Sequence, residues 1–207
     1  MQAEEVGMID VLDASDDPLR LAVARGVRLY DEDELFACLT DTQPVLRTAA
    51  ARALHARASR PVFDRVLPLT GHARHDMREI AAFILGQLGT ADRPFAQESF
   101  PALGRLLDDA YWEVRRAAVG AIGSLSEPGR QAPRAVRDRV LALATDAAPD
   151  VRTSVSVALG TIDDPQARVC LERLLEDEDR RVREDAQLGL DIMEADRLDG
   201  GGRVAAE

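Results

Sequence analysis

The sequence predicts an all-α fold, an α-α superhelix of about six stacked helix pairs. A hydrophobic residue followed by arginine recurs at intervals of 27 to 37 residues, and such self-similarity is typical of stacked repeats. The chain is also 46% hydrophobic but only 4% aromatic, so its core must consist of Ala, Leu, Val and Ile, which suit close helix packing. The six pairs are Leu19-Arg20, Leu46-Arg47, Met77-Arg78, Val114-Arg115, Val151-Arg152 and Val182-Arg183. We call these six arginines the repeat arginines.

Each repeat is predicted to contain two antiparallel helices. The first, the A helix, carries spaced Leu, Val and Phe; the second, the B helix, is rich in alanine and begins close to the repeat arginine. Pro18, Pro44 and Pro149 mark first turns of B helices, where the missing N–H has no helical partner. Gly123 and Gly160 mark B-helix ends.

The fourth repeat shows the pattern most clearly. Residues Phe100–Leu107 end its A helix, residues 108–110 form a turn, and Tyr111–Leu125 form its B helix. In this B helix, Val114, Ala118, Ala121 and Ile122 share one face, and the fifth and sixth repeats match that spacing. We expect residues 1–195 to form one solenoid domain and residues 196–207 a flexible tail.

A second element of the repeat is an aspartate six residues before the repeat arginine. It is present in four repeats, whereas the first has Ala14 and the third has His72 at this position. We expect these side chains to form an ion-pair ladder along the stack or to cap the B helices, a structural role and not a catalytic one. The ladder residues are Asp41, Arg47, Arg78, Asp109, Arg115, Asp146, Arg152, Asp177 and Arg183.

The run Val-Arg-Thr-Ser-Val-Ser-Val-Ala-Leu-Gly at 151–160, with its preceding aspartate, resembles the HEAT repeat, specifically the bacterial phycobilin-lyase-like type. The resemblance covers about residues 16–192. Residues 33–88 further resemble small bacterial HEAT-repeat proteins, some labelled as lyases and others suggested to be immunity partners of toxins. This resemblance implies a protein-binding scaffold, with a chromophore lyase or chaperone subunit as the alternative.

Composition excludes several classes of protein. The net charge of −11 disfavours nucleic-acid binding, which requires a basic surface, although a DNA-glycosylase-like function stays as a minor alternative because of Arg25, Arg28 and Arg52. The start of the chain lacks the pattern of a secretory signal, and no apolar run is long enough to span a membrane. Cys38 and Cys170 are far apart in the sequence, so we expect free thiols in a reducing compartment. Together, these features lead us to expect a cytoplasmic location and no membrane partner.

The sequence contains no strong catalytic or cofactor motif. His72, His75 and Asp76 are the one metal-like cluster, but two histidines and one acid are few for zinc, and a solvated turn explains them better. There is no phosphate-binding glycine loop and no nucleophile elbow. We therefore expect no enzyme activity, no catalytic residues, no cofactor and no metal.

The predicted binding surface lies on the B helices. Positions one, five and eight residues after the repeat arginine form a stripe that faces away from the Val/Ala core stripe, on the concave side of such a stack. Aromatic and arginine anchors are favoured at protein interfaces, although packing between repeats explains Phe83 and Trp112 equally well. The expected partner-binding residues are Arg25, Arg52, Phe83, Tyr111, Trp112 and Arg116. Two longer connections, at 90–98 and 126–135, could also carry binding or be inert.

Overall fold

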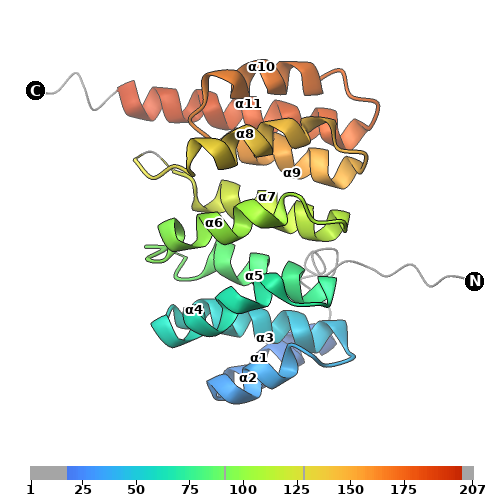
Figure 1. Cartoon of the computed structure of the whole chain (residues 1–207), viewed down its shortest axis with the longest axis vertical. Coiled ribbons are helices and arrows are strands. Elements are labelled where there is room, and N and C mark those ends of the chain that lie inside the picture. Colours follow the sequence, from blue (N-terminus) through green and yellow to red (C-terminus); the bar gives the residue numbers. More distant parts are fainter. Residues whose placement is uncertain (1–17, 91, 128, 202–207) are drawn as a thin grey trace, which may run out of the picture. The chain divides into compact units, whose positions relative to one another are not determined.

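The computed structural model describes residues 18–90, 92–127 and 129–201, and in these residues the fold is all-α (Figure 1). It contains eleven α-helices and no strand; two residues, Glu127 and Arg130, form an isolated bridge. The predicted fold class is confirmed. Six B helices and five A helices fall within the described residues, and the A helix expected for the first repeat lies outside them.

By its internal contacts the chain divides into two compact units, Met1–Ala102 and Leu103–Glu207. The first contains the B helices α1 (Pro18–Gly26), α3 (Pro44–Arg57) and α5 (His75–Gln87), and the A helices α2 (Glu32–Cys38) and α4 (Arg60–Val66). The 3-10 turns η1 (Val27–Leu29) and η2 (Leu67–Gly71) follow α1 and α4. Helix α6 (Ala96–Leu106) contains the division between the units.

The second unit contains the B helices α7 (Trp112–Leu125), α9 (Pro149–Leu159) and α11 (Arg180–Gly201). Its A helices are α8 (Arg134–Ala142), followed by η3 (Leu143–Thr145), and α10 (Pro165–Leu174). Helix α11 continues to Gly201, so residues 196–201 of the predicted tail are helical, and residues 202–207 lie outside the described part. A single domain over residues 1–195 stays a prediction.

Within each unit the B helices pack against one another and the A helices pack beside them. In the first unit α3 contacts both α1 and α5; in the second, α9 contacts both α7 and α11 (Figure 1). The predicted core stripe of α7 is buried, with Val114, Ala118 and Ile122 fully inaccessible to solvent. Small side chains on these faces allow the close approach that the alanine-rich B helices predict.

Glycine permits the closest of these approaches. A Cβ atom on Gly123 of α7 would lie 2.8 Å from the Cβ of Ala158 on α9, and one on Gly160 would lie 2.9 Å from the carbonyl oxygen of Gly189 on α11. Both distances are shorter than van der Waals contact. Glycine at these positions therefore serves interhelix packing, beyond the helix-ending role that the sequence predicts.

Candidate protein-binding surface

The repeat arginines fix the turns from which the B helices begin. In five repeats the Nη1 atom of the arginine donates to the backbone carbonyl six residues earlier, at 2.7 to 2.9 Å. In the same turns, the side chain at that earlier position accepts a hydrogen bond from the N–H group two residues later, at 2.7 to 3.1 Å. Arginine and aspartate together hold each turn closed. The arginines are Arg47, Arg78, Arg115, Arg152 and Arg183; the acceptors are Asp41, His72, Asp109, Asp146 and Asp177.

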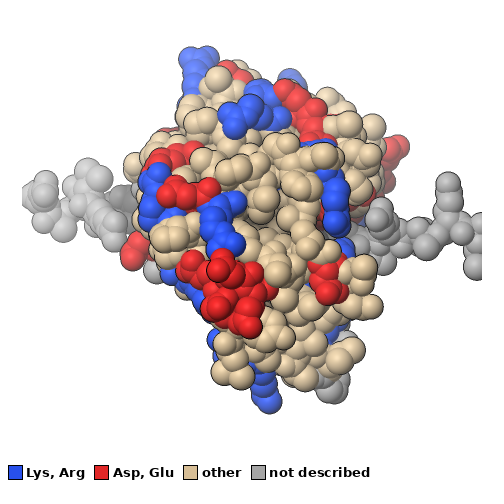
Figure 2. Space-filling view, turned by 60° about the horizontal axis from the view of Figure 1, so that its bottom comes forward, with Lys and Arg blue, Asp and Glu red and all other residues tan. Residues whose placement is uncertain are grey.

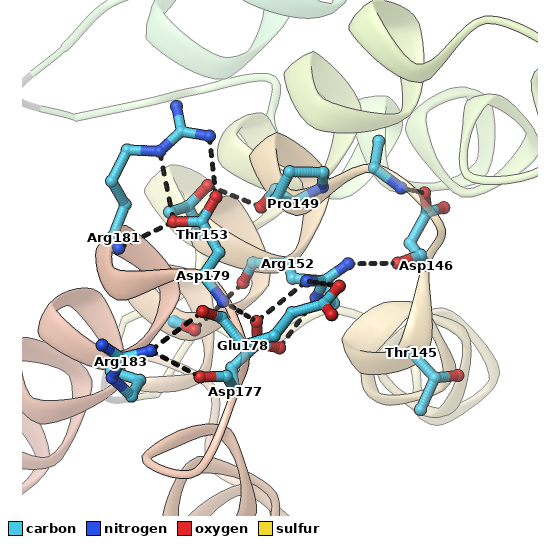
Figure 3. A network of polar contacts seen from close by, with 12 residues as sticks. Thr145, Asp146, Pro149, Arg152, Thr153, Asp177, Glu178, Asp179, Arg181 and Arg183 are labelled. Carbon is cyan, nitrogen blue, oxygen red and sulfur yellow. Dashed lines mark hydrogen bonds and ion pairs between the residues drawn. The ribbon is translucent and has the colours of Figure 1, made fainter.

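The second unit also contains the predicted ion-pair ladder (Figure 3). Arg115 donates through Nε and Nη2 to both carboxylate oxygens of Asp146, each at 2.8 Å, and Arg152 does the same with Asp177. The Arg152–Asp177 pair is about nine-tenths buried on both sides. Each of these arginines therefore bonds its own turn and the carboxylate of the next repeat.

The ladder lowers the pKa of its carboxyl groups. Hydrogen bonds from Arg152 hold the pKa of Asp177 below its usual value, and the N–H group of Asp179 adds to this effect. Burial acts on Asp146 in the opposite direction, but hydrogen bonds from Arg115 and from the N–H group of Ala148 prevail and lower its pKa. Both groups stay ionised near neutral pH, which agrees with a structural role.

In the third repeat, His72 stands in place of the aspartate and makes the hydrogen bond within the turn but not the ion pair with the preceding repeat arginine. Its Nδ1 accepts from the N–H group of Arg74 at 3.1 Å, as the aspartates do in the other turns. His72 offers no carboxylate to the preceding repeat arginine, and Arg47 forms no ion pair among the described residues, although its charge helps to lower the pKa of Asp76 in this turn. Asp76 of the same turn pairs with Arg74 at 2.6 Å. In the described part of the chain, no three His, Cys, Asp or Glu side chains are grouped to hold a metal ion.

The exposed surface of the B helices is narrower than the sequence predicts. Positions five residues after the repeat arginine are accessible to solvent, and we call them the exposed line: Arg25, Arg52 and Phe83 in the first unit; Gly120, Val157 and Leu188 in the second. Flanking positions expected in the same stripe are covered in the middle repeats, where Thr48, Glu79 and Arg116 are only 6%, 4% and 7% exposed.

The burial of Arg116 corrects one expectation. Arg116 was predicted to be an exposed anchor, but its guanidinium lies 5.2 Å from the centre of the Trp112 ring and is shielded from solvent. Trp112 itself is half-buried, and its neighbour Tyr111 is 48% exposed at the N-cap of α7. Arg116 therefore supports the indole from the α7 surface by a cation–π contact and does not meet solvent itself.

The other predicted binding residues lie in the first unit. Arg25 of α1 and Arg52 of α3 are exposed, and Phe83 of α5 is half-buried with its ring edge-to-face with His55 at 5.8 Å. Burial, followed by the charge of Arg52, lowers the pKa of His55, so the imidazole is neutral near pH 7. Phe83 belongs to one unit and Trp112 to the other, so each forms part of the surface of its own unit.

The longer connection at 126–135 is tied to the next loop. The side chain of Gln131 donates to the carbonyl of Thr161 at 3.1 Å and accepts from the N–H group of Asp163 at 2.9 Å. These bonds give this connection a packing role that its length alone did not indicate. The thiols of Cys38 and Cys170 are free and half-buried, and burial raises the pKa of both, which keeps them protonated.

Comparison with known proteins shows which repeat family these helix pairs resemble. A family model described as HEAT repeats matches residues 100–191, and a model of the PBS lyase HEAT-like repeat matches residues 77–109. Residues 77–191 contain HEAT repeats. These HEAT repeats include the turns and ladder pairs described above for the second unit, from Asp109 to Arg183.

Protein YibA of Escherichia coli K12 is 25% identical over 170 residues, which cover 82% of this chain and 60% of YibA. The chain thus matches less than two thirds of that relative's length. The X-ray structure of YibA aligns with a TM-score of 0.53 at 21% identity, covering 84% of this chain and 75% of the other. A designed armadillo repeat protein in complex with peptide (KR)4 aligns with a TM-score of 0.55 at 17% identity, covering 89% and 97%. At these identities the structural likeness concerns the fold.

Proposed function

We propose that this chain is a non-enzymatic scaffold that captures another protein on the exposed surface of its B helices. One observation carries the proposal: apolar side chains stand in solvent on this surface. Tyr111, Val157 and Leu188 are 48%, 37% and 46% exposed, although the adjacent helix faces are packed to near-complete burial. Partly exposed aromatic and aliphatic groups on a rigid support are typical of protein interfaces.

The rigidity of this support favours binding. The ladder pairs connect successive repeats of the second unit, and the closed turns hold the start of each B helix, so little conformational entropy is lost when a partner docks on this unit. The resemblance to immunity-type HEAT proteins suggests what capture achieves: the scaffold occludes the working surface of its partner. Solved armadillo structures of this fold, such as the designed protein with peptide (KR)4, support a polypeptide as the ligand class.

No membrane partner is part of the proposal. Among the described helices, none has both the length and the apolar character that crossing a bilayer requires.

Charges of both signs are scattered over the face seen in Figure 2, where uncharged residues occupy a large area. The face seen in Figure 2 carries separate basic clusters in place of the continuous basic patch on which nucleic-acid binding depends.

The test is partner capture followed by quantitative binding. The immobilised protein is incubated with extract of the organism that encodes it, and a captured protein is identified, purified and titrated by calorimetry. We expect Trp112→Ala to weaken binding at least about 30-fold, because truncation of an interface anchor typically costs about 2 kcal/mol or more. Val169→Ser is the matched control, since Val169 is 47% exposed but lies on α10, an A helix.

Two results would contradict the proposal. Equal affinity of both variants for the partner would place binding elsewhere, provided that circular dichroism shows both to be folded. A visible chromophore that copurifies with the protein, with no protein partner, would support the lyase-like alternative.

A further inference from the structure

Gly120 is the one glycine of α7 that packing within the second unit does not explain. A glycine inside a helix destabilises it by roughly 0.5–1 kcal/mol relative to alanine. Gly123 has a structural reason, because a Cβ atom would meet Ala158, and so does Gly189, where a Cβ would lie 2.4 Å from the carbonyl oxygen of Ser156. At Gly120 a Cβ atom would meet nothing within 4 Å, and the position is exposed. The bare backbone surface here faces outward.

Two apolar side chains continue this surface across the unit. Val157 on α9 and Leu188 on α11 occupy the same repeat position as Gly120. The three helices pack with equivalent positions side by side, because Gly123 of α7 packs on Ala158 of α9 as Gly160 of α9 packs on Gly189 of α11. Packed helices lie about 8–10 Å apart, so the line from α7 to α11 is about 16–20 Å long. An extended polypeptide covers that length with about six residues.

Carboxylates surround the α11 end of the line. Glu184, Asp185 and Asp191 lie three or four residues from Leu188, which makes them its neighbours on the helix surface. Asp191 accepts from Gln187 at 2.9 Å, and Glu184 pairs with Arg180 at 3.5 Å where both side chains are mostly exposed. Asp185 forms no ion pair within the described residues; burial and then the charge of Glu184 raise its pKa, although the charge of Arg181 acts in the opposite direction. A cation at this end would relieve that repulsion.

A lysine or arginine side chain fits the surface around Leu188 on α11, because it is both apolar along its stem and positively charged at its tip. Its methylene stem is apolar enough to cover Leu188, while its charged head remains at the wet rim. The acidic excess of residues 103–207, with 15 Arg against 21 Asp and Glu, also attracts a basic partner. A partner with acidic side chains would meet like charge at the same place.

We infer that Gly120, Val157 and Leu188 form a docking line for an extended basic segment of the partner protein. The segment's backbone passes over Gly120, and one of its Lys or Arg side chains lies over Leu188 among the three carboxylates. This inference rests on the proposed function, because it specifies which part of the B-helix surface binds and which chemistry it selects.

The experiment uses two fluorescein-labelled octapeptides, Ser-Val-Lys-Ser-Val-Lys-Ser-Val and its twin with Glu in place of Lys. Fluorescence anisotropy measures their binding to the full chain at low salt. We expect the basic peptide to bind and its acidic twin not to bind. Gly120→Tyr should weaken binding at least about tenfold by filling the open surface. The triple variant Glu184→Gln, Asp185→Asn, Asp191→Asn should weaken it to a similar extent.

A second triple variant distinguishes binding at the carboxylates around Leu188 from non-specific electrostatic attraction to an acidic protein. Asp163→Asn, Glu172→Gln, Glu176→Gln makes the same change of charge at exposed positions in and beside α10 and should leave affinity within about twofold. Equal losses in the two triple variants, unchanged affinity of Gly120→Tyr, or equal or absent binding of both peptides would overturn the inference. Gly120→Ser adds only a small side chain at the same position and should bind the basic peptide nearly as well as the unaltered chain. Unchanged melting temperatures of all variants would exclude misfolding as the cause of a loss of binding. If Trp112→Ala still weakens capture of a partner protein while neither peptide binds, the proposed function stands and this inference alone fails.

Discussion

At the scale of single residues, one arginine performs two tasks in each ladder step. Arg152 closes its own turn through the carbonyl of Asp146 and reaches the carboxylate of Asp177 in the next repeat. Lysine could not replace it, because a point charge lacks the planar fork that serves two acceptors at once. The geometry explains why the repeat requires both an arginine and an aspartate six residues apart.

The contribution of the ladder to stability should depend on pH. The pKa of Asp177 is lower in the folded than in the unfolded chain, so its ion pair stabilises the fold above the unfolded-state pKa of about 3.9. That stabilisation is lost as the pH falls through the lowered folded-state pKa. We expect Asp177→Asn to lower the free energy of unfolding by about 2 kcal/mol at pH 7 and by progressively less below pH ~4, measured by urea titration.

Glu178 provides the control for this prediction. It lies 3.7 Å from the same guanidinium, but its side chain is 92% exposed. Glu178→Gln should change stability by less than about 0.5 kcal/mol, as exposed ion pairs generally do. A loss in Asp177→Asn that is constant from pH 7 to pH 2 would disprove the ionic account.

The third repeat offers the opposite test, a gain of stability. Asp at position 72 would keep the hydrogen bond from the N–H group of Arg74 and add a carboxylate at the ladder position, where Arg47 now has only the more distant charge of Asp76. We expect His72→Asp to raise the free energy of unfolding by about 0.5–1 kcal/mol at pH 7, whereas His72→Asn, which caps without charge, should not. Equal stability of the two variants would show that Arg47 does not reach this turn.

At the scale of elements, the B helices were well predicted and their exposed surface was not. The Val/Ala stripe and the repeat arginine predict the B helix of the fourth repeat at Tyr111–Leu125, and α7 spans Trp112–Leu125, because helical period and turn chemistry are local properties. Burial of Thr48 and Arg116 is a property of tertiary packing, which local sequence does not specify. Alanine and glycine indicated a close approach but did not show how many flanking positions it would cover.

Two glycines of α7 give a matched test of this packing. Gly123→Ala places a Cβ atom 2.8 Å from Ala158, so the two helices must separate, and we expect a loss of about 1–3 kcal/mol in unfolding free energy. Gly120→Ala meets no neighbour and should instead stabilise the protein by about 0.5–1 kcal/mol through helix propensity. Thermal and urea unfolding of the two variants measure both effects. Similar values for the two would mean that α7 and α9 are not packed at Gly123.

At the scale of the whole molecule, the sequence predicted the class of fold but not its division. A repeat with a period near 30 residues specifies helix pairs that each contact their neighbours, and the described helices follow that order. The two compact units divide inside α6, next to Pro101 within that helix, and the repeat pattern gave this proline no significance as a boundary. The partner-binding residues remain predictions, since a binding surface is selected by the partner and not by the repeat.

Hydroxyl-radical footprinting of the chain with and without its captured partner reports side-chain accessibility across all described helices in one experiment, so it locates the binding surface. We expect oxidation of Trp112, Val157 and Leu188 on the B helices to fall when the partner binds. Oxidation of Val169 on the A helix α10 should not change. Protection of Val169 with no change at the three B-helix residues would contradict the claim that the B-helix surface is where this protein binds.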